Sequence, residues 1–192
     1  MRSDFVERDI LAHVLFALTP INALVCRVCL ESGLRVDDAL SLKSSDLQKT
    51  SFVVTEMKTG KKKRIRLSQS LKKELQNICG AVYVFEHRTD PNKHRTRQAV
   101  FYDMKRAVKM FRLRDNITPH TLRKVYAVDL MRRYGDIRKV AEALNHDLNH
   151  PSTTIIYALA DILYNGVTTK KGKDRSPYLF IFGAIPSSCR TL

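Results

Sequence analysis

The spacing of the apolar residues constrains the fold of this chain most strongly, because it follows the helical period along most of its length. Two short segments, 51–57 and 64–67, alternate instead and flank the turn Lys58-Thr59-Gly60-Lys61-Lys62, a pattern typical of a β-hairpin. A further short strand or extended segment is expected at 81–85. The sequence therefore predicts a mainly α-helical α+β fold with one small antiparallel sheet, with helices at 4–18, from Pro20 to about Gly33, and at 36–42, 69–79, 97–111, 119–134, 136–145 and 154–164.

The charge of the chain is strongly unbalanced. It holds 34 Lys plus Arg against 19 Asp plus Glu, a formal net charge of +15. Such an excess favours a polyanionic partner, with nucleic acid ahead of an anionic membrane. No run of 18 apolar residues marks a membrane span, and the charged N-terminus does not fit a signal peptide. We therefore expect a cytoplasmic protein with no membrane partner.

The cysteines give no sign of a disulfide framework, since only four are spread over 192 residues. Cys26 and Cys29 form a C-x-x-C, but the pair lies in an apolar helical run without a second pair at metal-ligand spacing. We interpret both as small buried thiols on one helix face. The sequence thus predicts a reducing environment and no metal centre.

Several cationic residues are candidates for a site, although each also has an ordinary structural explanation. Arg35 follows a helix end and has Asp38 nearby to orient its guanidinium. Lys58 opens a turn segment with six Lys or Arg between positions 58 and 66, a charge run that often forms only a solvated face. On a tight hairpin, however, such a run can enter a DNA groove and contact phosphates.

A second group of candidates lies in the C-terminal half. His120 and Arg123 have the i, i+3 spacing that places both on one helix face, where they can meet one phosphate. Taken alone, they are more readily explained by capping and a surface ion pair. His146 follows a predicted helix end, and Tyr157 lies in a predicted helix, where a lone tyrosine usually belongs to the core.

The order of these elements is more specific than any one of them. The run Gly33-Leu34-Arg35, the basic Lys58-Thr59-Gly60 turn, H-x-x-R at 120–123, L-x-H at 144–146 and T-T-x-x-Y at 153–157 resembles the tyrosine recombinase or phage integrase family. The resemblance spans residues 20–162. It includes SGLRVDDALSL around Arg35 and TPHTLRKVYAVDLMRRYGDIRKVAEALNH before residue 147.

The resemblance implies a catalytic site and a role for each member. Tyr157 would attack a DNA phosphate and form a 3′-phosphotyrosyl bond, while Arg35 and Arg123 stabilise the charge. Lys58 would protonate the leaving 5′ oxygen, and His120 would accept the tyrosine proton. His146 would hydrogen-bond the phosphate, and His150 is the alternative. The first is eleven positions before Tyr157 and the second seven, whereas the family spacing is nine.

The same resemblance implies the organisation and the partners. We expect a catalytic domain over 1–177 and an apolar tail over 178–192, which packs on its own domain or on a neighbouring subunit. The family's N-terminal core-DNA-binding domain is expected to be absent from this chain. The partner would be double-stranded DNA at a specific site, bound by a homo-tetramer on two duplexes, with a monomer possible without DNA. No cofactor is expected, and the predicted DNA contacts are Lys61, Lys62, Lys63, Arg64, Arg95 and Arg97.

Two other functions stay open at this point. A type IB topoisomerase shares this chemistry but relaxes supercoils without a specific site. A non-catalytic DNA-binding protein on the same fold is the other alternative, which the unusual spacing between His146 and Tyr157 keeps open. Site-specific DNA recombination, as in integration of a mobile element, is the function that the sequence favours.

Overall fold

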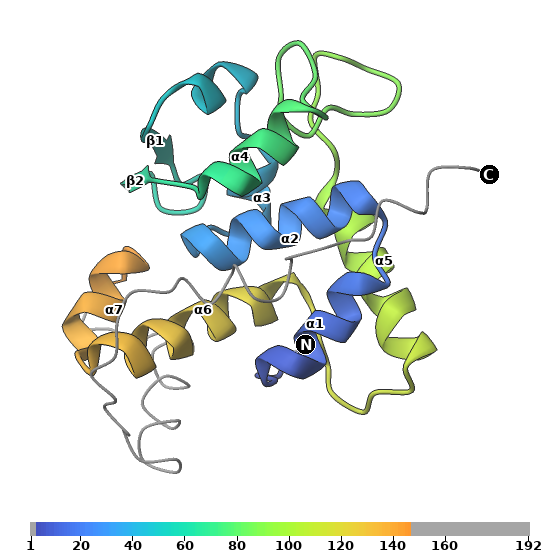
Figure 1. Ribbon diagram of the computed structural model, residues 1–192, viewed down its shortest axis with the longest axis vertical. Helices are drawn as coiled ribbons and strands as arrows, with labels where there is room; N and C mark the ends of the chain where they lie inside the picture. Colours follow the sequence, from blue (N-terminus) through green and yellow to red (C-terminus); the bar gives the residue numbers. More distant parts are fainter. Residues whose placement is uncertain (1–2, 147–192) are drawn as a thin grey trace.

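The computed structural model describes residues 3–146. His150, Tyr157, the predicted helix 154–164 and the tail 178–192 lie outside the described residues. The elements, drawn in Figure 1, are α1 (Arg8–Phe16), α2 (Pro20–Ser32), α3 (Val36–Leu40), the 3-10 helix η1 (Ser44–Gln48), β1 (Phe52–Thr55), β2 (Lys62–Ile65), α4 (Gln69–Gln76), α5 (Arg97–Met110), α6 (Pro119–Tyr134) and α7 (Ile137–Ala143). The predicted mainly helical fold with a small antiparallel sheet is confirmed.

Helices α2 and α6 form the centre of the fold and pack against each other. The core gathers apolar residues from all the surrounding elements, among them Val14, Val25, Leu71, Met104 and Leu122, each at most 2% exposed. A smaller cluster joins α6 to α7 through Ala127, Met131, Val140 and Leu144. Because α6 packs on α2, α5 and α7, polar side chains in its middle are enclosed as well.

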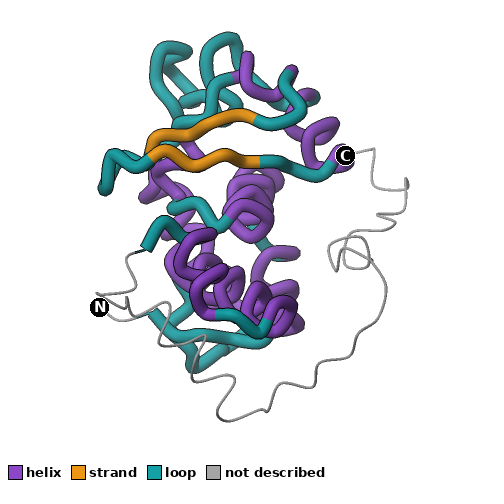
Figure 2. Tube along the Cα trace, turned by 90° about the vertical axis from the view of Figure 1, so that its left-hand side faces the viewer, coloured by secondary structure: helices purple, strands orange, loops and turns teal. Residues whose placement is uncertain are grey.

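Strands β1 and β2 form a two-stranded antiparallel sheet that crosses the fold on one side of the helices (Figure 2). Phe52 pairs with Ile65 and Thr55 with Lys62. Alternate residues point inward, so Phe52, Val54, Lys63 and Ile65 are buried. The connecting turn, residues 56–61, is closed by a hydrogen bond from Gly60 N to Glu56 O (2.8 Å), with Gly60 in the left-handed region at φ 67°.

Some boundaries differ from the sequence expectation. The first helix begins at Arg8 rather than near residue 4, because Asp4 exchanges hydrogen bonds with Asn116: Asp4 N donates to the Asn116 carbonyl (3.1 Å), and Asn116 N donates to Asp4 Oδ2 (2.7 Å). The segment 81–85, expected as a strand or extended segment, forms bends and turns around an isolated antiparallel bridge between Lys43 and Tyr83.

The two cysteines of the C-x-x-C are buried in α2 as free thiols, as predicted. Burial raises the pKa of the Cys29 thiol to about 12. Both thiols are therefore protonated at neutral pH and act as small apolar groups in the core.

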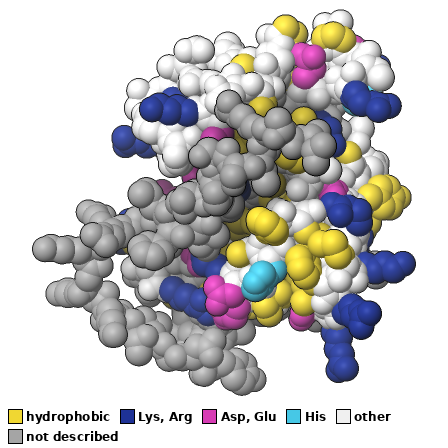
Figure 3. Space-filling view, turned by 45° about the vertical axis from the view of Figure 1, so that its right-hand side comes forward, with side chains coloured by type: hydrophobic (Ala, Val, Ile, Leu, Met, Phe, Trp, Pro, Cys, Tyr) yellow, Lys and Arg dark blue, Asp and Glu magenta, His cyan; other side chains and the backbone are white. Residues whose placement is uncertain are grey.

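The surface near α1 and α5 carries apolar side chains between basic ones, as Figure 3 shows. Phe16 is 91% exposed, and Tyr102, Met110 and Phe111 are exposed at or near α5. Within residues 3–146, no helix combines the length and apolar character needed to span a lipid bilayer.

Candidate functional site

The connection between α2 and α3 places Arg35. Helix α2 ends at Gly33, whose φ of 67° is left-handed and whose N–H donates to the Cys29 carbonyl (2.8 Å). Glycine fits here for two reasons: it adopts this conformation without strain, and a Cβ at this position would collide with the ring of Tyr126 on α6. Arg35 then begins α3 as its N-cap residue, with its side chain partly exposed.

The start of α6 places His120 and Arg123. Thr118 caps the helix: its hydroxyl accepts from His120 N (3.3 Å), its own N–H donates to Thr121 Oγ1 (3.2 Å), and Pro119 follows in the first turn. His120 lies at the exposed N-terminal end of the helix, whereas Arg123, one turn later, is 2% exposed. The two residues that were predicted to share one helix face therefore differ in exposure: the imidazole of His120 lies at the surface, and the guanidinium of Arg123 is buried.

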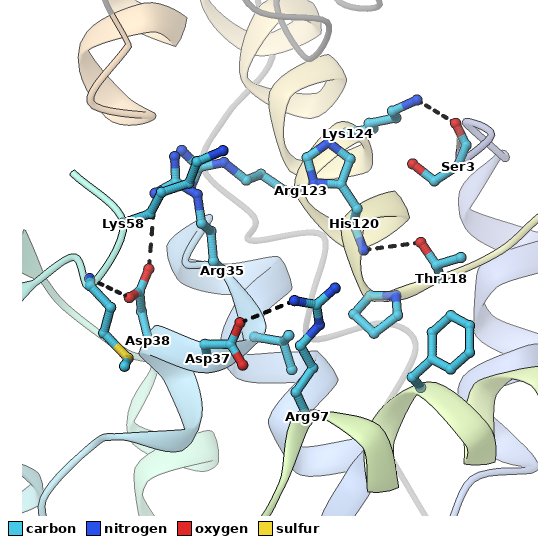
Figure 4. A pocket seen from close by; sticks show the side chains of 14 residues that line it. Ser3, Arg35, Asp37, Asp38, Lys58, Arg97, Thr118, His120, Arg123 and Lys124 are labelled. Atoms are coloured by element: carbon cyan, nitrogen blue, oxygen red, sulfur yellow. Dashed lines mark hydrogen bonds and ion pairs between the residues drawn. The ribbon is translucent and has the colours of Figure 1, made fainter. Parts of the chain in front are cut away.

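One cavity of about 660 Å³ brings together residues that are far apart in the sequence. It is lined by Arg35, Lys58, His120 and Arg123, which were expected from the sequence as members of one site. In the close-up of Figure 4, Arg35, Lys58 and Arg123 approach one another from α3, the hairpin turn and α6, with His120 beside them. The cavity thus brings the three cationic groups and the imidazole of the expected site together with Arg97 and Lys124, a set suited to binding a phosphate group.

Buried carboxylates lie beneath these cations. Asp38, 1% exposed, accepts a hydrogen bond from Met57 N (2.9 Å) and is 4.0 Å from Arg35 Nη1. Arg35 Nη1 donates instead to Glu56 Oε2 at 2.7 Å. Asp38 therefore pairs with Arg35 as expected, but the shorter contact comes from Glu56, which follows β1 and was not expected at the site.

The pKa values of the two carboxylates shift in opposite directions, although burial acts on both in the same way. Desolvation raises the pKa of Asp38, with the neighbouring Glu56 charge adding to the rise. For Glu56, desolvation alone would also raise the pKa, but hydrogen bonds from Thr59 and Arg35 outweigh it and hold the pKa below its ordinary value. Glu56 is thus a buried carboxylate that stays ionised next to the cations.

Arg123 is fixed by interior backbone carbonyls. Its Nη1 donates to the Gly33 carbonyl and its Nη2 to the Leu144 carbonyl (2.6 Å). Burial, together with the neighbouring Arg35, lowers the pKa of Arg123 to about 10, so it stays charged at neutral pH. Its guanidinium therefore joins the end of α2 to the end of α7 while lining the cavity.

His146 lies next to Arg123, with its Nε2 3.1 Å from Arg123 Nη2. A guanidinium only donates, so Nε2 accepts this bond and the imidazole carries its proton on Nδ1. Burial and then the Arg123 charge lower the pKa of His146 to about 4, in agreement with a neutral ring. Burial and the charges of Lys124 and Arg123 also lower the pKa of His120.

The residues that were predicted to contact DNA differ in how exposed they are. Lys61, Lys62 and Arg64 are exposed on the hairpin, and Arg97 is exposed at the cavity, 3.6 Å from Asp37 in an ion pair. Arg95 is half-buried and donates from Nε to Asn22 Oδ1 (2.8 Å). Lys63 does not fit the expected role: strand alternation turns it inward, and its Nζ donates to the Ser32 carbonyl (2.6 Å).

Two residues at or next to the candidate site were not expected from the sequence. Glu56 had a usable signal, since it has the same inward parity as Phe52 and Val54 and precedes Lys58 by two residues. Lys124 had none: it is buried beside the cavity, where its Nζ donates to the Ser3 carbonyl, a residue 121 positions away.

Comparison with known proteins identifies the family of the chain. The phage integrase family model matches residues 9–162. A tyrosine recombinase of Thermosipho africanus is 30% identical over 164 residues, which cover 80% of this chain and 56% of that protein. In structure, the chain is similar to the XerA recombinase (TM-score 0.65, 22% identity, 82% of this chain and 59% of that one). It is also similar to lambda integrase in a tetramer bound to a Holliday junction (TM-score 0.66, 21% identity, 82% and 48%).

The extent of the match shows which family the chain belongs to and how much of its relatives' length the chain covers. The chain spans about half the length of the curated relatives it matches. The matched region includes Arg35, Lys58, His120 and Arg123, which line the cavity, together with His146 and Tyr157. The chain therefore belongs to the phage integrase family, whose relatives here are tyrosine recombinases.

Proposed function

We propose that this chain carries the catalytic site of a site-specific DNA recombinase that cuts and rejoins DNA through a covalent bond to Tyr157. The observation that carries the proposal is the meeting of Arg35, Lys58 and Arg123 with His120 in one cavity. These residues come from three separate parts of the fold, and each was expected in the site on sequence grounds. DNA, with its regular phosphates, is the polyanion that also suits a chain of net charge +15.

The proposed reaction exchanges one phosphodiester for another. The Tyr157 oxygen bonds to the phosphorus, the bond from phosphorus to the 5′ oxygen breaks, and a 3′-phosphotyrosyl link retains the strand. The tyrosine proton passes to His120, which the lowered pKa keeps neutral and able to accept it. Lys58 gives a proton to the 5′ oxygen, and a second 5′ hydroxyl reverses these steps to rejoin the DNA.

The charge of the transition state is assigned to the arginines. Arg35 is partly exposed and reaches the cavity directly, whereas Arg123 is held by two carbonyls and His146. A pre-oriented guanidinium needs no reorganisation when negative charge grows on the phosphate oxygens. With these roles, the arginine side chains supply the positive charge that stabilises the transition state, so we propose a reaction that proceeds without a metal ion. His146, with Nε2 directed at Arg123, supports that guanidinium and offers Nδ1–H to the phosphate.

The assembly is part of the proposal. Lambda integrase forms a tetramer on a Holliday junction in a structure similar to this chain. We propose a homo-tetramer on two duplexes, with Lys61, Lys62, Arg64 and Arg97 as exposed phosphate contacts on each subunit. Residues 1–177 would form the catalytic domain and 178–192 a packing tail, and the reaction would take place on DNA in the bacterial cytoplasm.

The direct test is capture of the covalent intermediate. The protein is incubated with a pool of random-sequence duplexes, each nicked so that a short cleaved fragment diffuses away, in buffer containing EDTA. Adducts that survive denaturation are isolated and sequenced. We expect one enriched site for the wild type and for Tyr164→Phe, a nearby control tyrosine, and no adduct for Tyr157→Phe.

The other outcomes separate the alternatives. An adduct that Tyr157→Phe forms equally well would refute the assignment. DNA binding without any adduct would favour a non-catalytic DNA-binding protein. Adducts without sequence enrichment, together with relaxation of plasmids of unrelated sequence, would favour a type IB topoisomerase. An adduct that forms only without EDTA would refute the metal-independent chemistry.

A further inference from the structure

Glu56 lies where the hairpin turn begins, and its side chain is fully buried. It continues the inward row of Phe52 and Val54, but it places a carboxylate where the two preceding positions place apolar groups. Its backbone also closes the turn, since Glu56 N donates to the Lys61 carbonyl (2.9 Å) and Gly60 N donates to the Glu56 carbonyl (2.8 Å). One residue thus anchors both ends of the turn that carries Lys58.

The carboxylate of Glu56 joins that turn to both arginines. Its Oε2 accepts from Arg35 Nη1 (2.7 Å) and from Thr59 Oγ1 (2.8 Å). Its Oε1 is 3.9 Å from Arg123 Nη1 and has no hydrogen-bond donor among the described residues. A single side chain therefore holds the guanidinium of Arg35 and the turn that carries Lys58 by hydrogen bonds, and lies within ion-pair distance of Arg123.

The electrostatic setting explains why a carboxylate is needed there. Arg35 is close enough to Arg123 that its charge lowers the pKa of Arg123, after the effect of burial. Two guanidiniums held this close repel each other unless an anion lies between them. Before a phosphate arrives, Glu56 is the nearest such anion, at hydrogen-bond distance from Arg35.

We propose that Glu56 is a positioning residue for the strand-cleavage reaction proposed above, on which this inference rests. It holds Arg35 and the Lys58 turn in the reactive arrangement before DNA binds. Its negative charge also opposes the entry of the phosphate, so the residue weakens binding while it speeds cleavage. A residue that only supports folding would not have these two opposite effects.

The two effects can be separated by substitution. Glu56→Gln removes the charge and replaces one carboxylate oxygen with an NH2 group. This group can only donate hydrogen bonds, and the neighbouring guanidiniums also only donate. We expect DNA binding to tighten by about threefold and cleavage of bound DNA to slow by about 10- to 100-fold. Glu56→Asp keeps the charge but is shorter by one methylene, so binding should stay unchanged while cleavage still slows. Thr59→Val frees only the turn and should slow cleavage less, again without a change in binding.

The experiment measures both steps on the full chain. Binding is followed by fluorescence anisotropy on the duplex enriched in the capture experiment, and cleavage by single-turnover adduct formation with protein in excess on its nicked form. Glu74→Gln is the matched control, because Glu74 also pairs with an arginine (Arg27 Nη2, 2.8 Å) but lies outside the cavity. It removes the same charge and should leave cleavage unchanged. Urea unfolding of each variant shows whether the fold is retained.

The outcomes are decisive in either direction. Slower cleavage with equal or tighter binding supports the proposal, whereas unchanged cleavage in Glu56→Gln and Glu56→Asp overturns it. Parallel losses of binding, cleavage and stability in Glu56→Asp and Thr59→Val also overturn it, because they indicate a purely structural role.

A second measurement does not depend on cleavage. If the wild type forms no adduct, the proposed function fails, and nitrogen NMR of the Arg35 guanidinium then tests the positioning by itself. Slow rotation in the wild type and in Glu74→Gln that becomes fast in Glu56→Gln supports it. Equal rotation in all three overturns it.

Discussion

The ammonium group of Lys63 lies in the interior, on the inward face of β2, and is 9% exposed. Its Nζ donates to the Ser32 carbonyl, next to the Gly33 carbonyl that accepts from Arg123. Two cations thus hold adjacent carbonyls at the end of α2, immediately before Arg35. Replacing Lys63 with Met, which has a similar length and no charge, tests how this buried charge changes the free energy of unfolding.

The magnitude follows from the pKa of Lys63. Burial, followed by the charge of Arg123, lowers it from the ordinary value of 10.5 to about 8. Between these two pH values the unfolded chain binds the proton more often than the folded one, so the group makes stability rise with pH. Over the full window the gain is (10.5 − 8) × 1.36, or about 3 kcal/mol, of which about 2.5 kcal/mol is reached by pH 10.

The measurement is the unfolding free energy from urea titrations between pH 7 and 10. We expect the wild type to gain about 2.5 kcal/mol relative to Lys63→Met over this range. At pH 7 the variant loses the hydrogen bond to Ser32 but also the cost of burying a charge, so the two proteins should differ by only about 1–2 kcal/mol. Lys62→Met, an exposed lysine on the same strand, corrects for the change in net charge.

One result would refute this reasoning. If the free-energy difference between wild type and Lys63→Met stays constant from pH 7 to 10, the ammonium group is not desolvated and the inward placement of Lys63 is wrong. A difference that falls with pH would contradict the sign of the linkage. Either result would also return Lys63 to the group of exposed residues predicted to contact DNA.

Three further predictions concern the residues that shape the cavity. Gly33→Ala should destabilise the fold by more than about 2 kcal/mol, because it adds both left-handed strain and a collision with Tyr126. Gly60→Ala has the same strain in open space and should cost only about 1 kcal/mol; equal melting temperatures for the two variants would contradict the collision. Arg123→Lys should cost about 2–3 kcal/mol in urea unfolding, since one ammonium cannot serve Gly33 O, Leu144 O and His146 together. His146 has a folded pKa of about 4 against an ordinary 6.5, so the unfolded chain takes up its proton first and stability should fall as pH drops through this window. After solvent screening we expect a loss of about 1 kcal/mol that is absent in His146→Gln, and a flat profile in the wild type would count against a neutral, partly buried ring.

The order of the elements could be predicted from the sequence because the signals are local. Apolar spacing indicated the helices, Gly33 and Gly135 the ends of two of them, and the alternation around Lys58 the hairpin, and within residues 3–146 the structure has these elements in that order. The first helix was predicted too long because its first residues pair with Asn116, a contact that no local pattern contains.

The cationic site was also predictable in part. Arg35, Lys58, His120 and Arg123 were expected together from their order and motifs, and they line one cavity. Tyr157, His150 and the tail 178–192 lie outside the described residues, so the nucleophile and the choice between His146 and His150 stay predictions. The position of His146 beside Arg123 shows how that histidine can act, but it does not exclude the other.

The sequence by itself determined which residues can do chemistry, because residue type, order and periodicity are properties of the chain. The tertiary structure decided which charges are buried and which face each other. Glu56 meets Arg35 across 21 positions, and Arg123 is enclosed because α6 packs on α2, α5 and α7. Burial and pairing depend on segments that are distant in sequence, and these interactions decide the pKa values of Lys63, Arg123 and His146 and the geometry of the site.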